Sequence, residues 1–324
     1  MNRSEYLNIR NQLALQRNPS ALLRHGLVDL LLVGAVGGLW RGFEDSWLRF
    51  AVVPLVFALI FRGFGIMHDA VHGAVSKNAL VNTLVGIWGG SFCLLPYESW
   101  KRSHLKHHHW SGNVERDPVM ALILTYPRLS KGMQKIISLG WQAWLPVLGF
   151  LQHVVFWNLS LKPLLKERFD WKVGVSLAAP GIFWAALIAL TPADFVLGAL
   201  VPSLFVYFVG IEVVNLPHHL GLPQHRGEIK FPVWEQYQTA RSCVYPKWFA
   251  KWVILNFNYH TEHHMFPDAP WYCLDKIHEP VARALGESYN SDLYLGWILE
   301  NKKKEMLEVL SSPPETNPAQ KTAA

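Results

Sequence analysis

The sequence has few cysteines and no concentrated basic segment. Its three cysteines, Cys93, Cys243 and Cys273, stand far apart, which argues against a disulfide framework, a zinc knuckle and an iron–sulfur ligand set. We find no GxGxxG nucleotide loop and no haem-cytochrome motif. The net charge of +6 comes from dispersed lysines and arginines. This dispersion favours loops that face anionic lipid over a nucleic-acid surface.

Apolar residues and tryptophan are abundant instead. The 324 residues could hold two soluble domains, but 51% are hydrophobic and 15 are Trp, which predicts one lipid-embedded unit. A membrane helix needs about 20 apolar residues. Four stretches approach this length and form two hairpins: residues 26–40, 49–67, 173–190 and 195–214.

Charged residues interrupt the first hairpin. Stretch 26–40 is short and carries Asp29, so we expect Trp40 or the adjoining loop to complete the span. Stretch 49–67 contains Arg62, which we expect to snorkel toward the nearer membrane surface. Most of the 30 basic residues precede the first hairpin, separate the two hairpins or follow the second. The positive-inside rule therefore predicts that both termini and the long middle segment are cytoplasmic.

Two weaker apolar stretches, 79–96 and 139–159, lie between the hairpins and are interrupted by polar residues, glycine or proline. We expect them to form interfacial or re-entrant helices. Residues 1–310 are predicted to form a single membrane domain. The tail 311–324 has too few apolar residues to order itself. The predicted fold is therefore all-α and integral to the membrane, with about four transmembrane helices in two hairpins plus interfacial helices.

Eight of the 15 histidines fall into three tight groups. The groups are HDAVH with His68 and His72, HLKHH with His104, His107 and His108, and HTEHH with His260, His263 and His264. On a helix, residues three or four apart share a face, so each group can direct its imidazoles at one point. The adjacent histidine of each HxxHH points about 100° away and can reach a second metal. Under the predicted topology all three groups face the cytoplasm and form a histidine-box cap.

A lone HxxxH on a helix is more often a structural or surface feature than a metal site. Two HxxHH groups and one HxxxH on the same membrane face are harder to explain that way, because clustered imidazoles gain little without a metal. Eight or nine histidines exceed the four ligands of one zinc and predict two metals. Imidazole suits zinc, copper, nickel and iron alike. Iron is the redox metal that would leave positions open for O2.

Carboxylates beside the boxes are predicted to accept hydrogen bonds from imidazole N–H groups. They are Asp69, Asp117 and Glu262. A fourth element, NLPHH, ends the last apolar stretch, and its Asn215 and His219 would share a helical face if Pro217 permits. On spacing alone, a polar helix end explains this element nearly as well.

The motifs HDAVH, HLKHH and HTEHH resemble the three histidine boxes of the membrane fatty acid desaturase superfamily. This superfamily also includes alkane hydroxylases, carotenoid ketolases and acyl-chain decarboxylases. The resemblance covers residues 68–264 in order and spacing. It implies a non-haem di-iron oxidoreductase that uses O2, with iron ligands in all three boxes and one more histidine near the last span.

The resemblance also selects among neighbouring histidines. In the family, an Asn is followed four residues later by the additional histidine, a pattern that favours His219 and places Asn215 beside it. The Asp-Pro pair at 117–118 resembles the family spacing best when His107 and His108, rather than His109, form the doublet of the second box.

The leading interpretation is a desaturase-like oxidase that abstracts hydrogen from a fatty acyl or other lipid hydrocarbon chain. It would use two Fe ions, O2 and a separate electron donor of the ferredoxin, rubredoxin or cytochrome type. Hydroxylation of an acyl chain or alkane, or oxidative decarboxylation to a terminal alkene, starts from the same abstraction, so these alternatives stay open. A metal transporter is disfavoured because it would hold its ligands near the membrane midplane, whereas these histidines cluster beyond the predicted helix ends. A zinc hydrolase is disfavoured because it would need HExxH or HxxEH, and HTEHH has neither arrangement.

Overall fold

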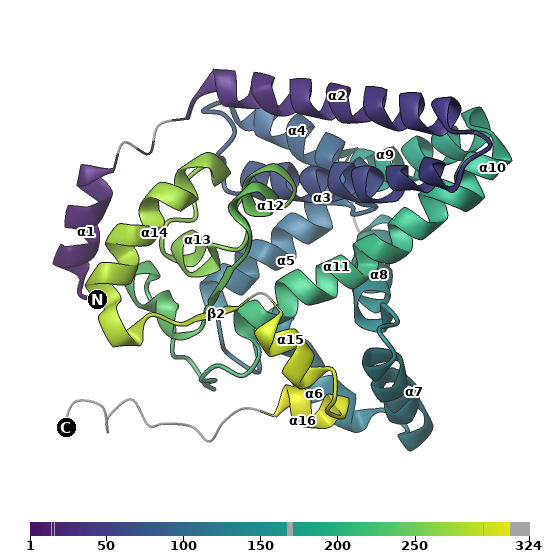
Figure 1. The fold of residues 1–324 in the computed structure, drawn as a ribbon. Coiled ribbons are helices and arrows are strands. Elements are labelled where there is room, and N and C mark those ends of the chain that lie inside the picture. The colour runs from purple at the N-terminus through teal and green to yellow at the C-terminus, as the bar shows by residue number, and fades with distance from the viewer. Residues whose placement is uncertain (14, 16, 167–170, 294, 312–324) are drawn as a thin grey trace.

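The computed structural model describes residues 1–13, 15, 17–166, 171–293 and 295–311. Within these residues the chain is mostly helical, and the only sheet pairs two short parallel strands, β1 (Ser242–Val244) and β2 (Ser291–Leu293). Figure 1 shows the long helices α2, α3 and α11 leading away from a group of shorter helices that includes α1, α13 and α14. Apart from Ser311, the predicted disordered tail lies outside the described residues.

Four helical segments of the described chain are long and apolar enough to cross a membrane. They are α2 (Pro19–Gly42), η1 with α3 (Trp47–Ala51 and Val52–Val71), α9 (Trp171–Leu190), and α10, η4 and α11 in series (Ala193–Phe195, Val196–Leu200 and Val201–His219). This confirms the predicted all-α membrane fold of about four spans. The spans are longer than the apolar stretches because flanking residues continue the helices, at both ends of three spans and at the N-terminal end of α9.

The first span includes Trp40 and continues through Arg41 and Gly42 of the following loop, as expected, but its larger extension is at the N-terminal end, where α2 begins at Pro19. Asn18 precedes the helix and its side-chain oxygen accepts a hydrogen bond from the Ser20 N–H at 2.9 Å. Pro19 occupies the first helical turn, where its missing N–H costs nothing. This cap lets α2 begin well before the apolar run at Gly26.

The two weaker apolar stretches form separate helices. α4 (Ala79–Phe92) is followed by α5 (Tyr97–Trp110) after a bend of 104°, so the chain turns sharply at the end of the first stretch. Leu94 lies in this bend in the left-handed region, at φ 57°. The second stretch is divided between α7 (Lys131–Gln142) and α8 (Val147–Lys166).

The remaining elements are short. They are α1 (Arg3–Gln12), η2 (Pro118–Met120), α6 (Ala121–Thr125), η3 (Tyr126–Arg128), η5 (Val233–Gln238), α12 (Lys247–Trp252), α13 (His260–Met265), α14 (Trp271–Leu285), η6 (Gly286–Ser288), α15 (Gly296–Asn301) and α16 (Met306–Leu310). Tyr6 and Ile9 of α1 pack with Phe266 and Ile277, which joins α1 to α13 and α14.

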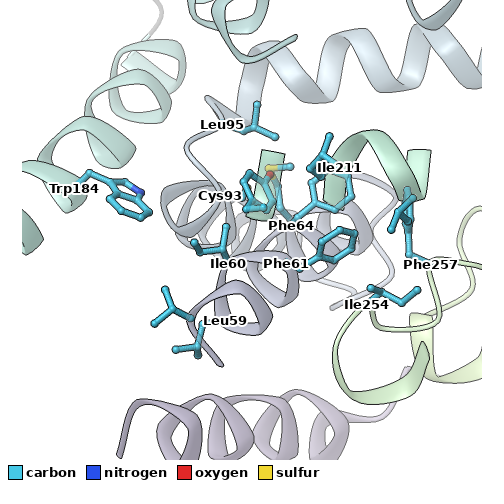
Figure 2. Close-up of a cluster of buried hydrophobic side chains, with 14 of the residues drawn as sticks. Leu59, Ile60, Phe61, Phe64, Cys93, Leu95, Trp184, Ile211, Ile254 and Phe257 are labelled. Atoms are coloured by element: carbon cyan, nitrogen blue, oxygen red, sulfur yellow. The ribbon is translucent and has the colours of Figure 1, made fainter. Parts of the chain in front are cut away.

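Helix α3 lies at the centre of the main hydrophobic core. Figure 2 shows Phe61 and Phe64 of α3 among side chains from other elements, including Cys93, Ile211 and Phe257. Every α3 residue from Ala58 to Val71 is buried. Because this half of the helix is covered on all sides, its apolar side chains are not confined to one stripe, and Arg62, His68 and Asp69 are its charged or titratable exceptions.

Arg62 does not snorkel, contrary to the sequence expectation. Its side chain is 1% exposed and forms an ion pair with Asp29 of α2. The guanidinium also donates to the backbone oxygens of His25, at 3.0 Å, and Trp252, at 2.8 Å. Asp29 is itself 3.0 Å from the imidazole of His25. Pairing two charges that the helices bring together costs less than leaving either one alone in an apolar surrounding.

Close approach of α3 and α4 requires glycine. A Cβ added to Gly89 of α4 would lie 2.5 Å from the Gly63 carbonyl oxygen of α3, and a Cβ on Gly63 would lie 2.5 Å from the Phe92 Cβ. The obstacle at Gly89 is backbone, which cannot rotate away. These glycines therefore set the spacing between the helix that carries the first histidine box and the helix that leads to the second.

We predict that Gly89→Ala destabilises the protein by about 2 kcal/mol, because overpacking a tight contact typically costs about 1–3 kcal/mol. Thermal unfolding of the purified protein in detergent would measure the change. Gly37→Ala is the matched control: it also lies in a membrane helix, but its Cβ would meet no atom within 4 Å. Equal melting temperatures for the two variants would contradict the proposed close contact.

Candidate metal centre

Four separate segments of the chain bring the predicted ligands together. α3 ends at the first box, α5 carries the second, α11 ends at the additional histidine, and α13 carries the third. Local helical structure accounts for the grouping within each box, whereas the packing of α3, α5, α11 and α13 accounts for their convergence. The site lies where the two long helices α3 and α11 end.

The histidines form two groups of four. In each group, one ring nitrogen from every member lies within 4.8 Å of the corresponding atoms of the other three. The first group consists of His68, His72, His104 and His263, and the second consists of His107, His219, His260 and His264. Both groups combine residues from at least three segments. The third-box doublet His263–His264 is divided between the two groups, and of the second box His104 belongs to the first group, His107 to the second and His108 to neither.

His108 lies between the two groups. Its Nε2 atom is 3.1 Å from Nε2 of His104 and 2.9 Å from Nε2 of His263. Its ring also stacks on His264 of the other group, with ring centroids 4.3 Å apart. The adjacent His109 is exposed and packs against Trp110 instead. The structure therefore gathers all nine predicted ligands and leaves His109 outside.

The donor set fits transition-metal ions. Nε2 of His72 is 2.9 Å from that of His104, and Nε2 of His219 is 2.8 Å from that of His260. Imidazoles that share one metal at about 2.0–2.1 Å bring their nitrogens to separations of about 3 Å. Burial, followed by neighbouring imidazoles, lowers the pKa values of His263 and His264 well below the usual range. These rings are therefore neutral, the state in which imidazole binds metal.

Outer acceptors fix the orientation of three rings. The Nδ1–H of His107 donates to Asp117 at 2.8 Å, and that of His219 donates to the Thr239 carbonyl at 2.9 Å. Nδ1 of His264 lies 2.9 Å from the Gln236 side-chain oxygen. A proton on Nδ1 leaves the Nε2 lone pair directed inward, where the rings converge.

Sequence reasoning missed Gln236 and Thr239. Gln236 also donates to the His108 carbonyl oxygen at 2.8 Å, so it links η5 to the second box. Both residues lie between the last span and the third box, in a segment without a recognisable motif. Their roles depend on contacts with distant parts of the chain, and no local spacing would have identified them.

Two of the predicted supporting residues make other contacts. Asp69 lies 3.9 Å from His68 Nδ1, too far for a hydrogen bond, and accepts the Trp271 N–H at 2.9 Å instead. Asn215 shares the end of α11 with His219, but its amide donates to the Ile211 carbonyl one turn earlier, at 3.1 Å. Asp69 therefore holds the start of α14 rather than an imidazole, which corrects the expectation.

Glu262 also departs from expectation, because it supports the helix that carries the third box rather than one of its imidazoles. Its fully buried carboxylate accepts hydrogen bonds from Ser242, at 2.6 Å, and from His278 and Tyr289, both at 2.7 Å. Hydrogen bonding to this carboxylate raises the pKa of His278. These three contacts attach the back of α13, a helix of six residues without a side-chain cap, to β1, α14 and the loop before β2.

His218 is buried beside the second group but outside it. Its ring stacks on His260, with centroids 4.2 Å apart and planes at 10°. Neither of its ring nitrogens has a hydrogen-bond partner within the described residues. α11 continues as a helix through Pro217, so His219 and His218 project in different directions.

Comparisons with known proteins point to one family. The family model described as fatty acid desaturase matches residues 45–295. A probable fatty acid desaturase from Sorghum bicolor is 29% identical, over 84% of this chain and 73% of its own length. An sn-1 acyl-lipid omega-3 desaturase (ferredoxin) from a Nostoc species is 26% identical over 85% and 79%. An endoplasmic-reticulum acyl-lipid omega-3 desaturase (cytochrome b5) from Arabidopsis thaliana is 26% identical over 87% and 76%.

We predict that His219→Ala loses bound metal whereas His218→Ala retains it, since only the His219 nitrogen reaches the second group. Loss of a direct ligand should weaken metal affinity by about 100-fold or more, because supporting residues alone are worth about 10- to 100-fold. Elemental analysis of both purified variants would test this with the same change at adjacent positions. Metal loss in the His218 variant alone would reverse the assignment.

Proposed function

From the premise that this chain belongs to the fatty acid desaturase family, we propose that it is an O2-dependent desaturase of lipid-borne fatty acyl chains. Family membership and the desaturase relatives make it a desaturase-like oxidoreductase in a membrane. The observation that carries the finer proposal is the pair of buried histidine groups at the ends of α3 and α11.

We assign one Fe ion to each histidine group. His68, His72, His104 and His263 would hold the first, His107, His219, His260 and His264 the second, and His108 would complete the shell between them. Bound iron would activate O2 to take hydrogen from the acyl chain. The protein supplies neutral nitrogen ligands, and Asp117 orients His107 from outside the shell.

Aromatic residues separate the histidines from water on the side of the hydrophobic core. Trp100 stacks on His104 with ring centroids 4.5 Å apart, and Phe257 lies edge-on to His68 at 5.0 Å. Phe64 packs against both Trp100 and Phe257. A site bordered in this way suits an apolar hydrocarbon substrate and excludes the water that would otherwise compete for the oxidant.

The stoichiometry of desaturation determines which co-substrates the reaction needs. Removing two hydrogen atoms from adjacent methylenes leaves a carbon–carbon double bond. These two hydrogen atoms, two electrons and two protons reduce one O2 to two water molecules. The two electrons must come from a donor protein, and the names of the relatives point to a ferredoxin or a cytochrome b5. We therefore propose a separate small redox protein as partner.

The proposed topology places both termini and the histidine groups on the cytoplasmic side, with residues 41–49 and 191–194 outside. Support comes from the distribution of basic residues. Both ligand-bearing spans, α3 and α11, reach the same end of the bundle at their C-termini, as this topology requires. Residues 1–310 would then act as one membrane oxidase domain.

Expression in a bacterium that lacks this enzyme, together with a ferredoxin and its reductase, tests the proposal. We predict new unsaturated acyl chains in the membrane lipids, detected by mass spectrometry. His263→Ala should abolish the product, because it removes a ligand of the first group, whereas His109→Ala should retain it because His109 lies outside both groups. Hydroxylated chains or terminal alkenes as the main product would refute desaturation.

A further inference from the structure

α12 presents an outward face of apolar and basic side chains. The exposed fractions of Trp248 and Trp252 are 66% and 46%, and Val244, three residues before the helix, is 54% exposed. Lys247 and Lys251 are also exposed. The opposite side of the helix is inside the protein: Ala250 is buried, and Phe249 packs against the main core. α12 is thus amphipathic although it has only six residues.

The position of α12 along the membrane spans is set by Arg62. The Trp252 carbonyl oxygen, at the end of α12, accepts a hydrogen bond from the Arg62 guanidinium at 2.8 Å. Arg62 lies six residues before His68 in the spanning helix α3, a rise of about 9 Å. The C-terminal end of α12 therefore lies beside a part of α3 inside the span rather than beyond its end.

This position contrasts with its place in the sequence. α12 follows the last span and belongs to a segment of mixed polarity that its composition assigns to the cytoplasm. In water, two large exposed tryptophans on one short helix would form an unfavourable apolar patch. At a bilayer surface, tryptophan rings suit the boundary between headgroups and chains, and lysines extend their ammonium groups to the headgroups.

We propose that α12 docks into the headgroup boundary of an anionic lipid bilayer. Trp248 and Trp252 insert among the upper acyl chains, and Lys247 and Lys251 bind anionic headgroups. Two features favour this partner: the lysines complement its charge, and the buried Arg62 holds the end of α12 beside the spanning helices, of which α2 is largely exposed. The proposal concerns a surface distinct from the histidine groups and does not depend on turnover.

The docked helix adjoins the third histidine box. After α12 the chain turns through Leu255 and Asn256, both in the left-handed region with φ 50° and 55°. Leu255 packs directly on Gly65 of α3, and the Asn256 amide donates to the Trp271 carbonyl at 3.1 Å. Phe257 then contacts the imidazoles of the site. A fixed turn therefore connects the proposed lipid contact to the start of α13.

A fluorescent probe at position 248 tests the docking directly. The three native cysteines are buried, so a nitrobenzoxadiazole label will react with an introduced cysteine in the variant Trp248→Cys. The full-length protein is placed in phosphatidylcholine–phosphatidylglycerol nanodiscs, and the label is quenched either by nitroxide-labelled lipid or by aqueous iodide. Glu228→Cys, an exposed position in the loop before η5, serves as the aqueous control.

We expect roughly threefold or stronger lipid quenching at position 248 than at position 228, with the opposite order for iodide. Iodide quenching at position 248 equal to that at position 228, without lipid quenching, would overturn the proposal.

A second arm tests the charge. In the labelled protein, Lys247→Glu with Lys251→Glu should abolish the increase in lipid quenching that phosphatidylglycerol causes relative to pure phosphatidylcholine. An unchanged response to phosphatidylglycerol in this variant would contradict the role of the lysines. Because neither arm measures turnover, failure here is distinguishable from failure of the proposed desaturase activity.

Discussion

The structure depends on the gathering of nine buried or half-buried imidazoles at one place without a hydrogen-bond donor for most of their inward nitrogens. Ring nitrogens about 3 Å apart cannot all be satisfied by hydrogen bonds to one another, because a neutral imidazole has only one proton to donate. Asp117, Thr239 and Gln236 accept hydrogen bonds from Nδ1–H groups on the outer side, which leaves the Nε2 lone pairs directed inward. Such a concentration of desolvated lone pairs is stable when cations bind them. Metal binding therefore contributes directly to the stability of the folded site.

The surrounding fold holds these rings in place from several directions. α3 is buried over its whole histidine-bearing half, and the glycine contact with α4 fixes its distance from the helix that precedes the second box. Glu262 attaches the short α13 through its back face. The Arg62–Asp29 pair connects α2 to α3, and the same guanidinium reaches α12. α3 and α13, which carry five of the nine ligands, are thus fixed by contacts outside the metal centre.

The sequence predicted the features that local spacing determines. Apolar length identified four spans, and the three histidine boxes identified eight candidate ligands, because helical periodicity alone places residues three or four apart on one face. Asn18 followed by Pro19 was a readable cap that would have placed the start of α2 correctly. The family resemblance, rather than spacing, supplied the choice of His219 over its neighbour.

Features that depend on pairing between distant segments were not predictable. Whether Arg62 snorkels or pairs depends on the rotation of α2 against α3, which composition does not specify. Asp69 and Glu262 are carboxylates beside histidines in the sequence, yet their helices direct them toward Trp271 and His278 instead. Gln236 and Thr239 could not be identified from the sequence, because their contacts depend on how η5 and the residue after it pack against α5 and α11. The depth of α12 likewise follows from one hydrogen bond to α3.

Anomalous X-ray scattering at the iron absorption edge, from crystals of the purified protein, would test the central claim most directly. The account predicts two iron peaks, one enclosed by His68, His72, His104 and His263, and the other by His107, His219, His260 and His264. A single peak, a signal at the zinc edge only, or peaks coordinated by carboxylates instead of these imidazoles would contradict it.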